Sequence, residues 1–456
     1  MPLLLVLALL AAQGSLAPGY AETLDLPRVL FLTHSAGFVH DVVRRPSPEE
    51  LAPAEKLFSS FSSGRFALDC TQDCSAISAQ NLAAYDAVVF MTTGELPIPP
   101  EGRAALVEWV AHGGGFTGIH CATDTLYEDA GYQAMIGGTF DGHPWADKEV
   151  RIHVEDPQHP AVSHLGTSFA IIDEIYQFKN FRRYPVHVLL SLEPGGFDAS
   201  LGKRADGDYA NAWARAWGDG RVFYTALGHR LEVWQDERFQ RHLLQGVAWT
   251  IDGEDPRCVA PRGSSVLVTP EGTAARDAWQ HRDGLECAWK TVDGGLEVVP
   301  GKGDLLSKQS FGDALVHVEF RCPSMPDATG QARGNSGVYV QDRYELQVLD
   351  SYGLELGLGD CGSLYGVKVA DVNACRAPER WQSYDIEFTA PRIGADGKRT
   401  DKARVSAWLN GRPIHDQVEL DGPTAGGAPV ESAQGPLRLQ DHGNPVRYRN
   451  VWVLAR

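Results

Sequence analysis

The sequence predicts a two-domain protein, in which an α/β domain with a parallel sheet precedes an all-β sandwich or jelly roll. The first observation is length, because 456 residues exceed the roughly 100 to 200 that one domain usually holds. The second is that, up to about residue 252, short apolar strands alternate with longer helical segments. The third is that, beyond about residue 278, short strands and glycine-rich turns follow one another with almost no helical period.

The chain starts with an apolar run, Pro2–Ala12, that is too short to span a membrane and has the length of a secretory signal core. Gly19 and Ala21 provide small residues at the cleavage positions, so we expect a signal peptide at residues 1–21 and a periplasmic or secreted mature protein. No Lys or Arg precedes Arg28, which leaves a disordered apolar N-terminus as the alternative. No other apolar run reaches about 18 residues, and we therefore expect no membrane insertion.

The α/β domain is predicted at residues 27–252. Its expected elements are strands at Val29–Thr33, Ala87–Thr92, Phe116–His120, Val186–Leu192 and Arg221–Thr225, and helices at Pro48–Phe61, Pro100–His112 and Glu237–Thr250. Parallel sheets place their sites at the carboxyl ends of the strands. The candidate site residues near such ends are His34, His120, Asp124, Glu174 and His229. They predict an acid/base or metal site that acts on a sugar, with ordinary structural histidines as the alternative.

Residues 253–277 are rich in Gly, Pro, Ser and Thr without a hydrophobic period, which predicts a linker. The β domain follows at residues 278–456. Its expected strands are Ala314–Arg321, Gly337–Gln341, Tyr344–Leu349, Ser383–Thr389, Arg404–Leu409, Leu437–Gln440 and Tyr448–Leu454.

Composition narrows the choice of partners. Lys plus Arg number 41 against 59 Asp plus Glu, and the net charge of −18 repels nucleic acid and anionic lipid. The 11 Trp and 14 Tyr residues supply aromatic faces that can stack on sugar rings. We expect a sugar substrate and neither a nucleic-acid partner nor a nucleotide cofactor, and the sequence leaves the oligomeric state open.

The chain has eight Cys residues, which can form disulfides in an exported protein. Cys70 with Cys74, or Cys361 with Cys375, lie close enough in the sequence to close small loops, although the sequence alone establishes neither pairing. A cysteine metal site is disfavoured because no CxxC pair occurs.

Several motifs of the first domain carry a family resemblance. They are Gly37–Asp41, Gly113–His120, Asp124–Thr125, Gly137–Phe140 with Gly142–Pro144, Asp173–Tyr176, and Gly220–Thr225 with Gly228–His229. Through them residues 27–252 resemble the ThuA-like (trehalose utilisation) family. The resemblance implies the flavodoxin-like fold of class I glutamine amidotransferases, whose nucleophilic cysteine occupies the sharp turn where this chain has His120. We therefore expect no thiol nucleophile at that turn.

The second domain carries a resemblance of its own. Its motifs are Gly334–Tyr339, Tyr344–Asp350, Gly362–Gly366, Trp381, Asn410–Gly411, Leu439–Gly443 and Val446–Asn450. Residues 278–456 are similar to the 3-keto-disaccharide hydrolase family. This similarity implies a concanavalin-like jelly roll and the cleavage of 3-keto-disaccharides or other 3-keto-glycosides.

Side chains alternate between the two faces of a strand, which groups several polar residues of the β domain on one face. These are Asn335 and Tyr339 on one strand, Glu345 and Gln347 on the next, and Arg438, Gln440 and His442 on a third. Acids, amides and a tyrosine on one sheet face are suited to sugar hydroxyls and sugar rings. We therefore predict a sugar groove on this face, with a solvated strand face as the alternative.

The chemistry of a 3-keto sugar assigns roles to these residues. The ketone acidifies the C2 hydrogen, so a base at C2 can form an enolate that expels the C1 substituent before water adds; hydrolysis through two carboxylates is the other route. We expect Glu345 as the base and His442 as the acid, with an arginine or a divalent metal ion stabilising negative charge. The expected substrate-binding residues are Asn335, Tyr339, Gln347, Tyr365, Gln440, Arg447 and Arg449, and the expected metal ligands are Asp350 and Asp441.

These observations leave two functions open. In the first, an exported carbohydrate-processing enzyme cleaves 3-keto-glycosides in its β domain while its ThuA-like domain acts on a related sugar. In the second, the β domain is a lectin-like sugar-binding module and the ThuA-like domain is a non-catalytic scaffold. A lectin needs no ionisable pair, so the presence of Glu345 with His442 favours the enzyme.

Overall fold

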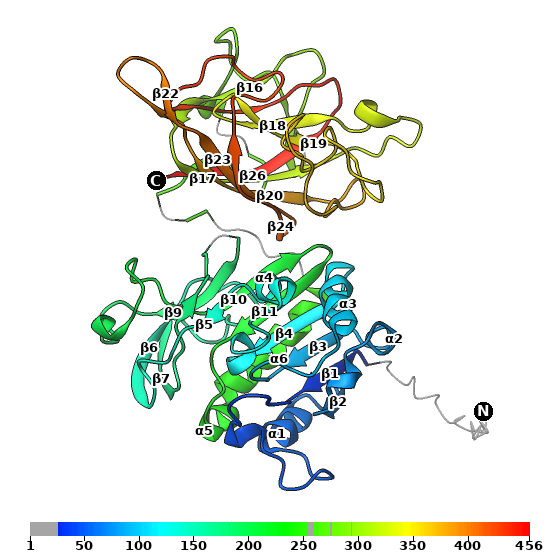
Figure 1. The fold of residues 1–456 in the computed structure, drawn as a ribbon, viewed down its shortest axis with the longest axis vertical. Helices are drawn as coiled ribbons and strands as arrows, with labels where there is room; N and C mark the ends of the chain where they lie inside the picture. The colour runs from blue at the N-terminus through cyan, green and yellow to red at the C-terminus, as the bar shows by residue number, and fades with distance from the viewer. Residues whose placement is uncertain (1–25, 184, 254–259, 262, 274–275, 293) are drawn as a thin grey trace, which may run out of the picture.

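A computed structural model describes the chain except for residues 1–25, 184, 254–259, 262, 274–275 and 293. The predicted signal peptide, its cleavage site at Ala21 and part of the predicted linker lie outside the described residues. Figure 1 shows an α/β domain in blue to green and a β domain that runs from green through yellow to red. Among the helices of the described part, none has the length and apolar character needed to cross a membrane.

Five parallel strands form the centre of the first domain. In spatial order they are β2 (Ala67–Thr71), β1 (Arg28–Leu32), β3 (Ala87–Phe90), β4 (Gly115–Ile119) and β11 (Gly220–Thr225). The order of the first four is that of flavodoxin-like folds, which confirms the predicted fold class. β3 reads as a continuous apolar run because it is buried on both faces of the sheet.

Helices cover both faces of this parallel sheet (Figure 1). One layer contains α1 (Pro53–Phe61), α5 (Leu231–Gln235) and α6 (Glu237–Asp252), and the other contains α2 (Ala79–Leu82), α3 (Pro100–Ala111) and α4 (Ala130–Ile136). Successive residues of β1 therefore enter different cores: Phe31 packs in the cluster that contains Leu243 of α6, whereas Leu30 packs in the cluster that contains Leu106 of α3.

The sheet continues beyond β11 as an extension whose antiparallel pairing the sequence did not predict, although β9 matches the strand expected at Val186–Leu192. It consists of β10 (Ala210–Trp217), β9 (His187–Leu192), β6 (Lys148–Val154) and β7 (Ser168–Asp173). A separate antiparallel pair joins β5 (Thr139–Phe140) to β8 (Phe178–Lys179). The expectation of a wholly parallel sheet is therefore wrong for this half, because tight turns such as the one at Gly218 connect neighbouring strands without a crossover helix.

The second domain is a sandwich of two antiparallel sheets, as predicted. The larger sheet contains β14 (Lys290–Val292), β15 (Gly295–Glu297), β26 (Arg447–Ala455), β17 (Ala314–Arg321), β20 (Gln382–Thr389), β23 (Ala403–Leu409) and β24 (Arg412–Leu420). The smaller sheet contains β13 (Trp279–His281), β16 (Leu305–Phe311), β25 (Gly435–Leu439), β18 (Ser336–Val340) and β19 (Tyr344–Val348). Val316 of the larger sheet and Val338 of the smaller sheet belong to one buried core between them.

Part of the predicted linker is structured. β12 (Ser265–Val268) pairs antiparallel with β26, so residues 265–268 belong to the β domain and the expectation of an unstructured linker is wrong there. The reason is that Leu267 and Val268 are buried in the sandwich core. Two adjacent apolar residues are too few to show a hydrophobic period in the sequence.

The two domains contact each other through hairpin turns. The backbone N–H of Gly218, after β10, donates to the carbonyl of Asn410, after β23, at 2.9 Å. The next residue, Gly411, has φ +76°, and a Cβ there would lie 1.9 Å from the carbonyl oxygen of Ala216. Only glycine fits this close approach between the domains.

The structure describes seven of the eight cysteines, and Cys258 lies outside the described residues; Cys70, Cys74, Cys361 and Cys375 are free thiols. Neither disulfide considered from the sequence is therefore present. Cys361 and Cys375 are nonetheless neighbours, because each thiol is within hydrogen-bonding reach of the other.

Candidate functional site

A sharp turn after β4 places His120 at the carboxyl edge of the parallel sheet. β4 ends at Ile119, and His120 follows with φ 46° and a fully buried side chain. Non-glycine residues seldom adopt this backbone region, and such strain is often held at functional sites. The Nδ1–H of His120 donates to the carbonyl of Ala226 at 2.7 Å, so Nε2 is the ring nitrogen that faces the site.

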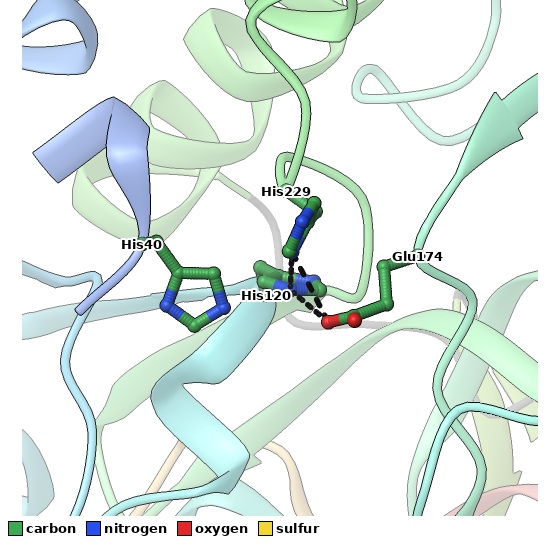
Figure 2. A group of neighbouring side chains, drawn as sticks. All are labelled: His40, His120, Glu174 and His229. Carbon is green, nitrogen blue, oxygen red and sulfur yellow. Dashed lines mark hydrogen bonds and ion pairs between the residues drawn. The ribbon is translucent and has the colours of Figure 1, made fainter. Parts of the chain in front are cut away.

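Three further side chains surround this nitrogen, as Figure 2 shows. Nε2 of His120 lies 3.3 Å from Oε2 of Glu174 and 3.3 Å from Nδ1 of His229, and Nδ1 of His229 lies 3.1 Å from the same Oε2. The ring of His40 has its centroid 5.0 Å from that of His120 and 5.1 Å from that of His229. One potential ligand atom from each of the four residues lies within 4.8 Å of the other three.

Loops at the ends of three strands bring these residues together. His40 lies on the segment between β1 and α1, Glu174 directly follows β7, and His229 lies between β11 and α5. The buried carboxylate of Asp173 accepts the backbone N–H of Gly228 at 2.7 Å and that of Arg230 at 3.1 Å. Asp173 therefore ties the loop that carries His229 to the strand that carries Glu174.

The electrostatics of the group reflect this crowding. Burial, together with the neighbouring His120 and His229, lowers the pKa of His40 to about 3. Burial raises the pKa of Glu174, but hydrogen bonds with His120 and His229 outweigh it and leave that pKa well below its ordinary value. Burial lowers the pKa of His229, but its hydrogen bond with Glu174 and the negative charges of Glu174, Asp173 and Asp147 together outweigh burial, so the net shift is upward. At neutral pH the site thus holds a carboxylate beside at least one neutral imidazole.

The structure brings together three of the residues predicted for this site, His120, Glu174 and His229. His34 lies outside the group, because its Nδ1 is hydrogen-bonded to the carbonyl of Gln72 at 2.8 Å. Asp124 also lies outside it, and its carboxylate accepts the hydroxyl of Tyr127. The group instead contains His40, which belongs to the Gly37–Asp41 motif but was not among the predicted site residues.

A second polar cluster lies on the smaller sheet of the β domain. Tyr339 of β18 faces Glu345 of β19, and its hydroxyl donates to Oε2 of Glu345 at 2.6 Å. The guanidinium of Arg438, on the neighbouring β25, lies 3.4 Å from the centre of the Tyr339 ring. Burial raises the pKa of Glu345 to about 7, although the Tyr339 hydroxyl and the charge of Arg438 act in the opposite direction.

Unpaired polar atoms lie around this carboxyl. The side-chain oxygens of Asn335, Gln347 and Gln440 are buried and accept no hydrogen bond from the described residues. The Nε–H of Arg438 is likewise buried and donates to no described group. Buried polar atoms normally find partners, so this set of three acceptors and one donor points to a bound polar ligand.

The structure places several other predicted residues away from Glu345. His442 lies in an exposed turn after β25, with no hydrogen bond or ion pair to any described residue. Arg447 and Arg449 lie on β26 of the other sheet, where they pair with Glu297 at 2.7 Å and Glu319 at 2.6 Å. The cation beside Glu345 is therefore Arg438, which strand alternation put on this face without assigning it a role.

The remaining predicted residues have structural contacts. Asp350 pairs with Arg333 at 2.7 Å, and Asp441 accepts the backbone N–H of Gly303 at 2.9 Å. Within the described ranges, the one group of His, Cys, Asp and Glu side chains with metal-binding proximity is the one around His120, so Asp350 and Asp441 do not form such a group. Tyr365 contacts Glu345 through its backbone, since its N–H donates to the Glu345 carbonyl at 3.2 Å.

The segment between β24 and β25 covers the Glu345 cluster. The hydroxyl of Thr424 accepts the backbone N–H of Glu345 at 3.0 Å, and the carbonyl of Gly426 accepts Nη2 of Arg438 at 2.9 Å. Glu345 is consequently only 2% exposed.

Comparisons with known proteins agree with this division of the chain. A family model described as trehalose utilisation (ThuA) matches residues 28–250, and one described as a 3-keto-alpha-glucoside-1,2-lyase-like domain matches residues 268–454. A solved candidate glycosyl hydrolase from Parabacteroides distasonis ATCC 8503 is 34% identical, with 43% of this chain and 85% of that chain covered and a TM-score of 0.40. A solved candidate ThuA-like protein from Bacteroides uniformis ATCC 8492 is 23% identical, with 54% and 97% covered and a TM-score of 0.39. No curated protein matches the chain.

Proposed function

Because this chain joins a trehalose utilisation (ThuA) domain to a 3-keto-alpha-glucoside-1,2-lyase-like domain, we propose that it is a carbohydrate-processing enzyme that cleaves 3-keto-glycosides at Glu345. The observation that carries the proposal is the state of this carboxyl. Its pKa of about 7 is close to the value at which a general base works best near neutral pH. A sugar-binding module has no need of such a group, so Glu345 favours an enzyme over a lectin.

The first step is proton removal. The ketone at C3 acidifies the hydrogen at C2, and the carboxylate of Glu345 takes that proton to leave an enolate whose negative charge is on the C3 oxygen. The unpaired Nε–H and the positive charge of Arg438 are suited to stabilise this oxygen. The unpaired oxygens of Asn335, Gln347 and Gln440 can accept the remaining sugar hydroxyls.

The second step is loss of the C1 substituent. As the enolate collapses to a C1–C2 double bond, the bond from C1 to the departing oxygen breaks and that oxygen takes up a proton. Protonated Glu345 can return this proton to the departing oxygen. Alternatively, His442 can donate one if the sugar extends to the exposed segment after β25 where His442 lies. Addition of water to the double bond then completes a net hydrolysis, and release before this addition would make the reaction an elimination.

The test is turnover of a 3-keto-glycoside by Glu345→Gln, which keeps the side-chain shape but accepts no proton at neutral pH. A positioned base contributes about 10² to 10⁴ in rate, so we expect a loss of that size with little change in binding. More than roughly a tenth of wild-type activity would remove Glu345 from this role. His442→Gln is the companion variant: a comparable loss assigns the acid to His442, and full activity assigns proton return to Glu345.

A further inference from the structure

The distances around His120 match those of a metal-binding tetrahedron. Zinc lies about 2.0 to 2.2 Å from nitrogen and oxygen ligands, so the ligand atoms of a tetrahedral site are about 3.3 to 3.6 Å apart. The three contacts among His120, Glu174 and His229 measure 3.1 to 3.3 Å. The ligand atoms of all four residues lie within 4.8 Å of one another. Only the ring of His40 would therefore have to move closer to the other three to complete the tetrahedron.

Two observations on the histidines point to a ligand between them. His120 donates its other ring N–H to a backbone carbonyl, the arrangement by which proteins orient metal-bound imidazoles. His40 is 2% exposed, yet neither of its ring nitrogens takes part in a hydrogen bond with the described residues. Figure 2 shows one of these nitrogens facing the other three side chains. An unpaired buried imidazole is costly unless something binds it.

The donor set identifies the class of metal. Three imidazoles and one carboxylate suit Zn²⁺ and its neighbours Fe²⁺, Co²⁺ and Ni²⁺, whereas Ca²⁺ and Mg²⁺ require mainly oxygen ligands. No thiol belongs to the group. The alternative is a metal-free acid/base cluster in which Glu174 shares protons with the histidines.

The site is open on one side. His40 and His120 are buried, whereas the side chains of Glu174 and His229 are 17% and 29% exposed to solvent. His229 also lines a pocket of about 400 Å³, together with Phe38, Asp147, Arg230 and Glu232. A metal held here would therefore remain accessible from the pocket, unlike a sealed structural zinc.

The pocket lining favours a neutral ligand over an anionic one. Its carboxylates are Asp41, Asp147 and Glu232, and its one cation, Arg230, already pairs with Asp147 at 2.6 Å and Glu232 at 3.4 Å. A phosphorylated sugar would meet excess negative charge there. The ring of Phe38 is 65% exposed and offers an apolar surface for a sugar ring.

We propose that His40, His120, Glu174 and His229 bind one zinc-class divalent ion, and that the adjoining pocket presents an unphosphorylated sugar to it. This second site is separate from Glu345, so neither assignment depends on the other.

The experiment uses the full-length protein stripped of metal, reloaded with Co²⁺ or Zn²⁺ and analysed by elemental analysis and visible absorption. We expect one ion per chain and the intense Co²⁺ bands of a four- or five-coordinate site. Loss of even a supporting group weakens metal binding by about 10- to 100-fold, so His229→Gln and Glu174→Gln should lose at least that much affinity. These two side chains are the less buried ligands, which keeps the test valid if a His120 variant does not fold.

Two controls are matched to these variants. His112→Gln changes an exposed histidine outside the group and should retain one ion per chain, as should Glu345→Gln, which separates this proposal from the proposed function. Binding of less than about a tenth of an ion per chain by the wild type, or unchanged affinity in both ligand variants, would overturn the metal site in favour of the acid/base cluster.

The pocket is tested on the Co²⁺ form with methyl 3-keto-α-D-glucopyranoside and, for comparison, glucose 6-phosphate. A change in the Co²⁺ spectrum with the neutral keto sugar alone supports the proposal. A change at lower concentration with the phosphate, or none with either compound, would overturn the assignment of the pocket.

Discussion

Tyr339 and Glu345 face each other on neighbouring antiparallel strands, and the tyrosine hydroxyl donates to the glutamate at 2.6 Å. This bond stabilises the ionised carboxylate, whereas burial stabilises the neutral acid, and burial is the stronger influence because the pKa is raised to about 7. The pair therefore sets the pH range in which Glu345 can act as a base.

Activity on a 3-keto-glycoside should rise with pH and reach half its limit near pH 7, because only the ionised carboxyl can accept the C2 proton. Tyr339→Phe removes a bond to the ionised form, so the midpoint should move to higher pH. The measurement is kcat/KM against pH for both proteins. A midpoint that stays in place or moves to lower pH would exclude Glu345 as the titrating group.

Glu345→Gln should stabilise the protein at pH 8 while inactivating it. The folded-state pKa of about 7 lies above the ordinary 4.5, so the folded protein holds a proton that the unfolded chain releases between these values. The free energy of unfolding therefore falls as pH rises through that window, by up to about 3 kcal/mol from this group. Denaturant unfolding at pH 5 and pH 8 should show a smaller pH dependence for the variant, and equal dependence in both proteins would contradict the raised pKa.

Arg438 and Arg449 give a matched test of which cation serves Glu345. Arg438 lies against the Tyr339 ring, whereas Arg449 lies on the other sheet and pairs with Glu319. Arg438→Lys should lower kcat by about 10² to 10³, the usual cost of losing a donor to a developing oxyanion. Arg449→Lys should leave kcat within roughly twofold, and the opposite ranking in steady-state kinetics would return the role to Arg449.

The two domains should fold as separate fragments. The apolar cores of residues 29–249 and 267–453 share no member. Polar contacts join the domains, such as the ion pair of Arg412 with Glu108 at 2.5 Å and the bond from Arg376 to the Gly218 carbonyl at 2.7 Å. Fragments 26–253 and 260–456 should each show a cooperative thermal transition, and a fragment that folds only with its partner present would contradict this.

Export is tested at the N-terminus. We expect the protein recovered from its native host to begin at Glu22, because the apolar core and the small residues Gly19 and Ala21 have the spacing of a cleaved signal. Mass spectrometry of the intact protein reads this directly. Exported protein that retains Met1 would rule out cleavage.

Strand and helix periodicity predicted most of what positions the two sites. The run Ala87–Phe90 is apolar because both faces of β3 are buried, and such runs can be read without knowing what covers them. Alternation also placed Tyr339 and Glu345 correctly on one face of the smaller sheet, since the side-chain period of a strand is local and strict. The antiparallel direction of the extension β10-β9-β6-β7 escaped prediction, because the direction in which strands pair depends on partners far along the chain rather than on the pattern within each strand.

The sequence by itself determined the two domains and the polar face around Glu345, because each follows from local patterns, whereas the sharp turn at His120 was expected only from the resemblance to the ThuA-like family. Tertiary structure alone decided that His40 rather than His34 joins Glu174 and His229, and that Arg438 rather than Arg449 lies beside Tyr339. The physical reason is that packing between segments more than 50 residues apart sets the direction in which a loop runs and the sheet to which a strand belongs. The contact of His120 with the Ala226 carbonyl is one example.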